Sequence, residues 1–350
     1  MIDTDEKLAA VLPQIRAAEW LAVDTEADSL HAYPEKLCLV QLSLPGADLL
    51  MDPLAPIDLG PLWAALGGRE LILHGADYDL RLLARNGFIP QSVFDTMLAA
   101  RLLGWREFGL TSLARECLGV TLEKGPQRAN WARRPLTPRM LAYALNDTRY
   151  LEPLADILRA RLVELNRLAW HQQTCAQLVQ TCSRPEEENP DTEWRLAGAN
   201  RLEPRGLAAL RELWRWRDHE ARVANLPPFF ILSHDALLAL AAAAGHGGAV
   251  EPLIPARYSP RRRAGLLEAV ARALALPKSA LPEPRRPRGC RMNYAQRQRL
   301  ASLRARRDRQ AAALGLEQSF IASRATLVAL ACDWDKHAPE LLPWQRDLLR

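Results

Sequence analysis

Acidic side chains stand at three separate places in the first 150 residues of this sequence. Asp24 and Glu26 follow an apolar run in WLAVDTE, and residues two apart on a strand share a face. Tyr143 and Asp147 lie four apart in MLAYALNDTRYL, which places both on one face of a helix. Asp79 opens a further expected helix in LHGADYDLRLL. If these places meet in one cleft, the acids repel one another unless a divalent cation neutralises them, and two-metal hydrolysis of a phosphodiester needs such an arrangement.

Two neighbouring acids compete with Asp79 for a role in the cleft. Asp77 lies in the same segment, but the spacing from Asp79 to Leu82 and Leu83 favours Asp79. Asp95 precedes Thr96 at the start of an expected helix, where aspartate is a preferred N-cap, so we assign it a structural role.

The composition is that of a soluble globular protein, with 49% hydrophobic and 25% charged residues over 350 positions, enough for two or three domains. No apolar stretch reaches 18 residues, and the acidic start MIDTDEKLAAVL is unlike a secretory signal. Six cysteines without a Cys-x-x-Cys pair favour reduced thiols over zinc or disulfides. We therefore expect a cytoplasmic protein with no membrane partner.

The net charge of +5 is unevenly distributed along the chain. Residues 1–200 hold 20 Lys and Arg against 27 Asp and Glu, whereas residues 201–350 hold 26 against 14. Residues 1–200 therefore carry a net charge of −7 and residues 201–350 a net charge of +12. This division suits a protein whose acidic half holds cations and whose basic half attracts a polyanion. A genome rich in arginine codons would raise the basic count everywhere, and the acidic first part argues against that explanation.

Strand and helix patterns alternate in the first half of the chain. The expected strands are 20–25, 37–43, 48–52 and 70–74, and the expected helices are 5–18, 59–66, 79–86, 96–103, 111–118 and 138–145. This order predicts an α/β fold, a mixed sheet with flanking helices on both faces. The acidic, proline-containing segment 185–191 is typical of a linker, and all-α helical domains are expected after it.

The helical half contains an internal repeat. Residues 210–241 align without gaps to residues 300–331, with 13 of 32 positions identical and a constant offset of 90. We interpret the two segments as copies of one small helical module. The second copy lacks counterparts of Trp214, Trp216 and the Pro227-Pro228 pair. A basic, proline-rich stretch that includes Arg285, Arg286 and Arg288 lies between the copies and is predicted to be a tether.

Four segments in this order resemble a known family: DTEADSLHAYPEKLCLVQLS, HGADYDLRLLARNGF, FDTMLAARLLG and QRANWARRPLTPRMLAYALNDTRYL. They are similar, over roughly residues 15 to 165, to the DEDD 3′-to-5′ exonucleases whose third motif is Tyr-x-x-x-Asp, and to the ribonuclease D family in particular. The resemblance implies a ribonuclease H-like fold. The first copy of the repeat resembles an HRDC domain. The implied domains are an exonuclease (1–183), a linker (184–202), an HRDC domain (203–282) and a degenerate second HRDC-like domain with the basic tether (283–350).

The same resemblance implies a role for each acid. Asp24 would bridge two divalent cations, Mg²⁺ or Mn²⁺, and Glu26 and Asp147 would complete the first site. Asp79 would hold the second ion through water. Tyr143 would orient the attacking water, since a phenol with a pKa near 10 is a poor general base.

Further residues are expected at the substrate. These are Thr25, His74, Gln127 and Arg128. His74 is about equally suited to a structural role. Gln127 and Arg128 share a loop with Lys124, Arg133 and Arg134, and this loop either grips phosphates or carries solvated charge.

The sequence and the resemblance together predict a metal-dependent 3′-to-5′ exoribonuclease. It would release nucleoside 5′-monophosphates from RNA 3′ ends, with tRNA precursors as expected substrates, and act as a monomer. An exonuclease that prefers DNA, and a catalytically silent nucleic-acid-binding protein, are the two alternatives. The presence of all five expected catalytic residues argues against the second alternative.

Overall fold

The computed structural model describes residues 1–350 except 124, 185–191 and 285–291. Residues 185–191 of the predicted linker, Lys124 and the three arginines of the tether therefore lie outside the described residues. Contacts divide the chain into two compact units. The first unit consists of Met1–Ala27, Leu37–Pro185 and Cys290–Arg350, and the second of Asp28–Lys36 and Glu186–Gly289.

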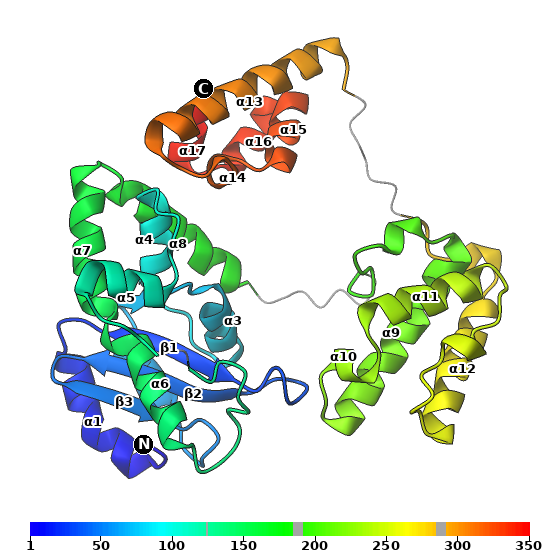
Figure 1. Cartoon of the computed structure of the whole chain (residues 1–350), viewed down its shortest axis with the longest axis horizontal. Helices are drawn as coiled ribbons and strands as arrows, with labels where there is room; N and C mark the ends of the chain where they lie inside the picture. The colour runs from blue at the N-terminus through cyan, green and yellow to red at the C-terminus, as the bar shows by residue number, and fades with distance from the viewer. Residues whose placement is uncertain (124, 185–191, 285–291) are drawn as a thin grey trace. The chain divides into compact units, whose positions relative to one another are not determined.

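A five-stranded mixed sheet forms the centre of the first unit (Figure 1). Its strands are β1 (Ala22–Ala27), β2 (Leu37–Leu44), β3 (Ala47–Met51), β4 (Glu70–Leu73) and β5 (Ser92–Asp95), in the order β3-β2-β1-β4-β5. β2 is antiparallel to β1 and β3, whereas β1, β4 and β5 are parallel. The predicted mixed sheet is confirmed. β5 was not predicted, because its four residues show no clear periodicity and are extended through pairing with β4.

Helices cover both faces of the sheet. One face carries α1 (Asp5–Ala17), α2 (Gly60–Leu66) and α3 (Asp77–Arg85), which share an apolar cluster with it. On the opposite face α6 (Pro138–Arg149) packs across β1, β2 and β3 (Figure 1). Thr137 caps α6 by accepting a hydrogen bond from the Met140 N–H, and Pro138 has the fixed φ that the first helical turn needs.

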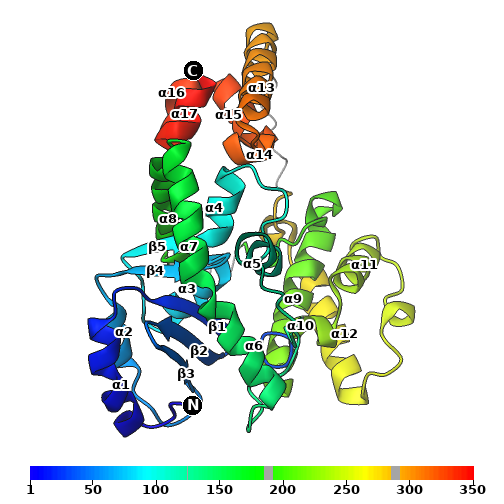
Figure 2. The ribbon, with the colours of Figure 1, turned by 60° about the vertical axis from the view of Figure 1, so that its left-hand side comes forward.

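Four more helices complete the segment that precedes residue 185. They are α4 (Thr96–Leu102), α5 (Leu110–Leu118), α7 (Leu151–Glu164) and α8 (Leu168–Cys182). α7 and α8 run side by side (Figure 2), and neither was among the expected helices. Helix α3 begins at Asp77 and not at Asp79. Its start carries no side-chain cap of its own, so the local sequence signal was weak.

The C-terminal helices belong to the first unit. They are α13 (Tyr294–Leu314), α14 (Gln318–Ile321), α15 (Arg324–Cys332), α16 (Trp334–His337), the 3₁₀ turn η4 (Ala338–Glu340) and α17 (Pro343–Leu349). They share one apolar cluster with α4, α5 and α7. The ring of Trp170 on α8 stacks on the ring of Trp344 on α17, with 5.1 Å between the ring centroids. Gly104 has φ +82°, and a Cβ there would lie 2.5 Å from the Gly315 carbonyl oxygen. The backbone segments around Gly104 and Gly315 therefore approach each other closely.

The second unit is a helical domain with its own core. Its elements are η1 (Ala199–Arg201), α9 (Pro204–Ala224), α10 (Pro228–Ile231), α11 (His234–Gly245), η2 (Glu251–Leu253), α12 (Pro260–Leu274) and η3 (Lys278–Ala280). The core includes Trp194 and Trp216. Segment 28–36 also belongs to this unit, where the Tyr33 hydroxyl donates to Asp218 at 2.5 Å.

The repeat is visible in the helices themselves. The bounds of α13 and α14 equal those of α9 and α10 plus 90. In the first copy the Arg217 guanidinium donates to the Leu232 carbonyl at 3.3 Å, and in the second Arg307 donates to the Ala322 carbonyl at 3.0 Å. The two segments therefore fold alike. None of the described helices has the length and apolar character needed to cross a bilayer.

Arg167 holds two helix ends together inside the first unit. Its side chain is buried and donates to the Leu102 carbonyl at 2.6 Å and to the Leu314 carbonyl at 2.9 Å, at the ends of α4 and α13. An Arg167→Ala substitution leaves both carbonyls without this donor. Because each buried unsatisfied group costs about 1–3 kcal/mol, we expect the free energy of unfolding to fall by about 2–5 kcal/mol in a denaturant titration.

The matched control is Arg304→Ala on α13, since the Arg304 side chain is 73% exposed. This change should stay within about 0.5 kcal/mol of the parent. Equal unfolding midpoints for Arg167→Ala and the parent would show that this contact does not secure α13.

Candidate active site

A cavity of about 730 Å³ lies where β1, α3 and α6 meet in the first unit. Eight of the nine predicted site residues line it. They are Asp24, Glu26, Asp79, Asp147, Tyr143, Thr25, His74 and Gln127. The ninth, Arg128, is exposed and stands outside this lining.

Three acids form a tight group in this cavity. Oxygens of Asp24, Glu26 and Asp147 all lie within 4.8 Å of one another. The strand period of two puts Asp24 and Glu26 on the same face of β1, and α6 packs on β1. The Gln41 amide on β2 donates to the second oxygen of Asp24 at 3.1 Å. One cation at this point would contact all three side chains.

Asp79 reaches the same cavity from the first turn of α3. It is 6% exposed, and one of its oxygens accepts hydrogen bonds from both the backbone N–H and the hydroxyl of Thr25, at 3.0 and 2.5 Å. The hydroxyl of Thr25 is thus engaged with Asp79. Asp77 is instead largely exposed and pairs with Arg81. The structure therefore places Asp79, and not Asp77, at the cavity.

Burial raises the pKa of Asp24, Glu26, Asp79 and Asp147, and repulsion by neighbouring acids adds to this effect. Burial, followed by repulsion from Asp147 and Asp79, raises the pKa of Glu26 to about 9. Burial raises the pKa of Asp147 to about 7 and that of Asp79 to about 6. The pKa of Asp24 also lies well above its usual range, because of burial and repulsion by the three other acids. Among the described residues that line the cavity there is no lysine or arginine, so these carboxylates fit a divalent cation.

Tyr143 is held beside the acids by close packing. A Cβ at Gly125 would collide with the Tyr143 ring, so only glycine fits at that point of the loop. The ring of buried Trp131 lies 6.1 Å away on another side. Burial, with repulsion by Asp147, raises the pKa of the Tyr143 phenol. The raised pKa favours the protonated hydroxyl, which can position a water molecule.

His74 faces the cavity from the end of β4. Its Nδ1 lies 2.8 Å from the Thr96 hydroxyl, and burial lowers its pKa, so the ring is neutral near pH 7. The predicted N-cap role of Asp95 is confirmed, since it accepts from the N–H groups of Met97 and Leu98. Its carboxylate also accepts from the backbone N–H groups at 75 and 76, and so fixes the turn that leads into α3.

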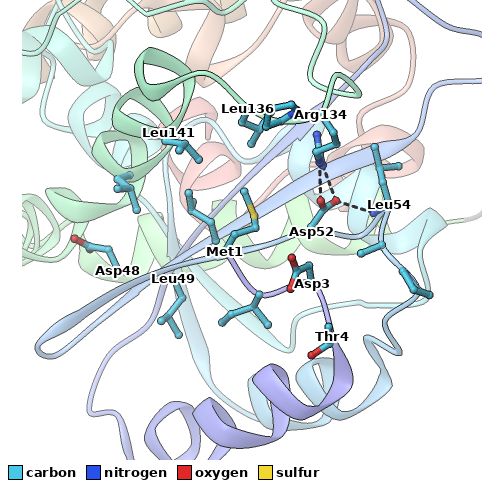
Figure 3. A pocket seen from close by; sticks show the side chains of 16 residues that line it. Met1, Asp3, Thr4, Asp48, Leu49, Asp52, Leu54, Arg134, Leu136 and Leu141 are labelled. Carbon is cyan, nitrogen blue, oxygen red and sulfur yellow. Dashed lines mark hydrogen bonds and ion pairs between the residues drawn. The ribbon is translucent and has the colours of Figure 1, made fainter.

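Arg134 does not lie at this cavity. Its guanidinium pairs with Asp52 at 2.5 Å and donates to the Cys38 carbonyl at 2.8 Å, at one end of a second cavity of about 940 Å³ (Figure 3). That cavity is mostly apolar, with side chains such as Leu49 and Leu136 in its wall. The prediction that the basic loop grips phosphates does not hold for Arg134, whose charge is already paired.

Sequence reasoning missed several residues of the lining. They include Tyr78, Met97, Glu123, Asn146 and the start of α5 at 109–112. Tyr78 lies between Asp77 and Asp79 and is 41% exposed, and Asn146 directly precedes Asp147. For Tyr78 and Asn146, the position next to a predicted metal ligand was the only signal in the sequence.

Comparisons with known proteins agree with this geometry. Residues 1–163 match the 3′-5′ exonuclease family, and residues 206–244 match the HRDC domain. The chain is 33% identical to ribonuclease D of Pseudomonas paraeruginosa over 366 aligned positions, which cover 99% of this chain and 94% of the relative. The chain belongs to the ribonuclease D family. It is a 3′-to-5′ exoribonuclease that acts on a nucleic acid.

Solved structures show the same relationship between ribonuclease D and this chain. Ribonuclease D of Escherichia coli, described as an exoribonuclease involved in structured RNA processing, superposes with a TM-score of 0.77 at 29% identity. The match covers 98% of this chain and 91% of that protein. A protein from Bifidobacterium adolescentis matches with a TM-score of 0.82 at 27% identity over 100% and 94% of the two chains. The exonuclease family is metal-dependent, which agrees with the acidic group in the cavity.

The raised pKa values predict how the metal-free protein responds to pH. In the unfolded chain the acids have lost their protons above about pH 4–5. The folded protein keeps protons on Asp79, Asp147 and Glu26 until about pH 6, 7 and 9. Because the folded state binds more protons in this window, the contribution of these acids to stability decreases as pH rises from about 5 to 9. We expect the Tm of metal-free protein to fall across this range and Mg²⁺ or Mn²⁺ to reduce the loss.

Glu26→Gln provides the control, since it removes the acid whose pKa is raised to about 9. Its Tm, followed by circular dichroism in EDTA, should depend less on pH than that of the parent. The account would be contradicted if the Tm of the parent and the Tm of Glu26→Gln depended equally on pH, whether metal is present or absent.

Proposed function

We propose that Asp24, Glu26, Asp79 and Asp147 hold two Mg²⁺ or Mn²⁺ ions for hydrolysis at RNA 3′ ends. Asp24 would be a ligand of both ions, Glu26 and Asp147 would complete one site, and Asp79 would hold the other ion through water. The observation that carries the proposal is the 4.8 Å grouping of three acids in a cavity whose described lining contains no lysine or arginine. Hard carboxylate oxygens are the ligands that these ions prefer.

Two ions held by these carboxylates would supply an activated water and would stabilise the departing oxyanion. The protein residues supply placement. The protonated hydroxyl of Tyr143 orients the attacking water, and Gly125 and Trp131 keep its ring in place. His74, neutral and bonded to Thr96, and Gln127 on the facing loop are positioned to contact the terminal nucleotide.

We further propose that the substrates are structured RNAs with accessible 3′ ends, such as tRNA precursors. Support comes from the Escherichia coli relative, which is described as involved in structured RNA processing, and from the +12 charge of residues 201–350. A basic region increases affinity for the phosphate backbone of any long RNA. We propose that the protein acts in the cytoplasm, in line with its cysteine pattern, and that it acts as a monomer.

One degradation assay tests polarity and sugar preference together. The purified protein is incubated with Mg²⁺ and matched RNA and DNA oligonucleotides, each with a free or a blocked 3′ end. We expect nucleoside monophosphates from the RNA with a free 3′ end, and little product when that end is blocked. Faster degradation of the DNA would instead support the DNA-preferring alternative.

Asp24→Asn tests the assignment of a shared ligand. Removing one charge from a group that contacts both ions should lower turnover by about 10²-fold or more, the scale of removing one electrostatic stabiliser. Circular dichroism and RNA binding should match the parent. Asp77→Asn is the matched control, because Asp77 is exposed and paired with Arg81, and its turnover should stay within a few-fold. Near-parental turnover in Asp24→Asn would refute the site assignment.

Tyr143→Phe separates water positioning from packing. The ring remains, so the contacts with Gly125 and Trp131 persist while the hydroxyl is lost. We expect kcat to fall by about 10²-fold with a smaller change in KM, as is typical when a group that positions a reactant is removed. Tyr150→Phe, at the end of the same helix, is the control. An unchanged kcat would limit Tyr143 to a packing role.

A further inference from the structure

Strand β2 is buried along its whole length, yet one of its faces carries two polar side chains. All eight residues of the strand are buried. Val40, Leu42 and Leu44 belong to the apolar cluster that the sheet shares with α1, α2 and α3. Because side chains alternate along a strand, Gln41 and Ser43 point to the opposite face, on which α6 packs. Buried polar groups are hydrogen-bonded in most proteins, so the partners of these two side chains indicate what they do.

Gln41 is directed at a proposed metal ligand. It lies directly opposite Asp24 in the antiparallel pairing of β1 and β2, and its amide Nε2 donates to Asp24 Oδ2 at 3.1 Å. Its amide oxygen is buried and has no hydrogen-bond partner among the residues that the structure describes. An unsatisfied buried acceptor destabilises a fold, and an apolar side chain of the same length would avoid it. Fold stability alone therefore does not account for a glutamine at this position.

The contact restricts the rotation of the Asp24 carboxylate about its Cβ–Cγ bond, since β2 holds one of the two oxygens. A lysine or an arginine could also hold this oxygen, but its positive charge would compete with a divalent cation for the carboxylate. A neutral amide orients the carboxylate and leaves its negative charge available. Groups that hold a metal ligand in this way typically change metal affinity or activity by about 10–100-fold when they are removed.

Ser43 connects the same strand to the helix that carries Asp147. Its hydroxyl donates to Asp48 on β3 at 2.6 Å and lies 2.7 Å from the hydroxyl of Thr148 on α6. Because the single proton of the Ser43 hydroxyl is given to Asp48, Thr148 is the donor in the second contact. The Arg149 guanidinium also donates to Asp48, at 2.7 Å. The two residues that follow Asp147 are therefore both tied to the β2–β3 hairpin.

We propose that Gln41 and Ser43 are positioning residues that set the separation between Asp24 on β1 and Asp147 on α6. Gln41 orients the Asp24 carboxylate, and Ser43, through Thr148, fixes the turn of α6 that carries Asp147. Neither Gln41 nor Ser43 lines the cavity. The presence of a cation rests on the proposed function, whereas the hydrogen bonds from β2 belong to the fold itself.

The test measures Mn²⁺ binding by the full chain without RNA, from the signal of free Mn²⁺ in electron paramagnetic resonance. Gln41→Met keeps the length of the side chain but loses the donor and the unpartnered oxygen. We expect the Kd for Mn²⁺ to rise by about tenfold or more. The Tm in EDTA should stay close to that of the parent, because the substitution removes an unsatisfied acceptor together with the donor.

Leu44→Ala on the opposite face of β2 is the matched control. It leaves a cavity in the core, so its Tm should fall, while the folded protein should bind Mn²⁺ as tightly as the parent. A residue that serves only the fold would lower the Tm as Leu44→Ala does. A positioning residue lowers the affinity for Mn²⁺ without that loss of stability.

Turnover measured over a range of Mg²⁺ concentrations gives a second readout. Gln41→Met keeps every proposed metal ligand, so high Mg²⁺ should restore most of its kcat, whereas Asp24→Asn should remain slow at every concentration. Ser43→Ala/Arg149→Ala removes both ties between α6 and the β2–β3 hairpin and should also weaken Mn²⁺ binding by about tenfold. Circular dichroism checks that each variant folds, and Gln41→Leu takes the place of Gln41→Met if the methionine variant does not.

Parental Mn²⁺ affinity in either folded variant would overturn the proposal for the residue concerned. A fall in Tm as large as that of Leu44→Ala, together with weaker Mn²⁺ binding, would also overturn it, since general loosening of the fold would explain both. Failure of the proposed function gives a different result, because Asp24→Asn would then bind Mn²⁺ as tightly as the parent.

Discussion

Mutual repulsion among buried carboxylates is the constraint on which the catalytic unit depends. Asp24, Glu26, Asp79 and Asp147 line one cavity, and the pKa of each lies above its usual range because of burial, to which the neighbouring acids add. Left to themselves these groups would separate or take up protons. The four acids stay close together because the backbone elements that carry them, one strand and two helices, are fixed by the fold. Such a site is unfavourable without a cation and becomes favourable when a cation is bound.

The positions of the acids depend on polar contacts that are not catalytic. The Asp95 carboxylate accepts hydrogen bonds from four backbone N–H groups in two turns. It therefore joins the end of β4 and the start of α3 to the start of α4. Thr25 then ties Asp79 on α3 to β1 through two hydrogen bonds. Each contact satisfies a buried donor that would otherwise destabilise the fold by about 1–3 kcal/mol. Fold stability and site geometry thus rely on the same bonds.

The sequence could reveal the parts of the site that follow local periodicity. Asp24 with Glu26, and Tyr143 with Asp147, share faces because of strand and helix geometry alone, and four of the five strands carried a readable pattern. What escaped detection depends on tertiary contacts. β5 is extended through its pairing with β4, Arg134 is drawn to Asp52 across 82 residues, and Gly125 is required only because the Tyr143 ring lies against it. No local pattern encodes such pairings.

The fate of the repeat shows how packing decides what a surface can do. A helical module of about 60 residues buries only about 60% of its surface and is marginally stable alone. The first copy has a core of its own that contains Trp216, whereas the second has Arg306 at that position and shares one apolar cluster with α4, α5 and α7. The second copy therefore gains stability by covering its aromatic face, Phe320 included, and that face is no longer available to a ligand. The first copy does not need this contact, so the corresponding face of α10 remains exposed to solvent. Both outcomes follow from the need of a small helical module to bury enough apolar surface. The second copy meets this need by packing within the first unit, and the first copy meets it with its own core and keeps an exposed aromatic surface.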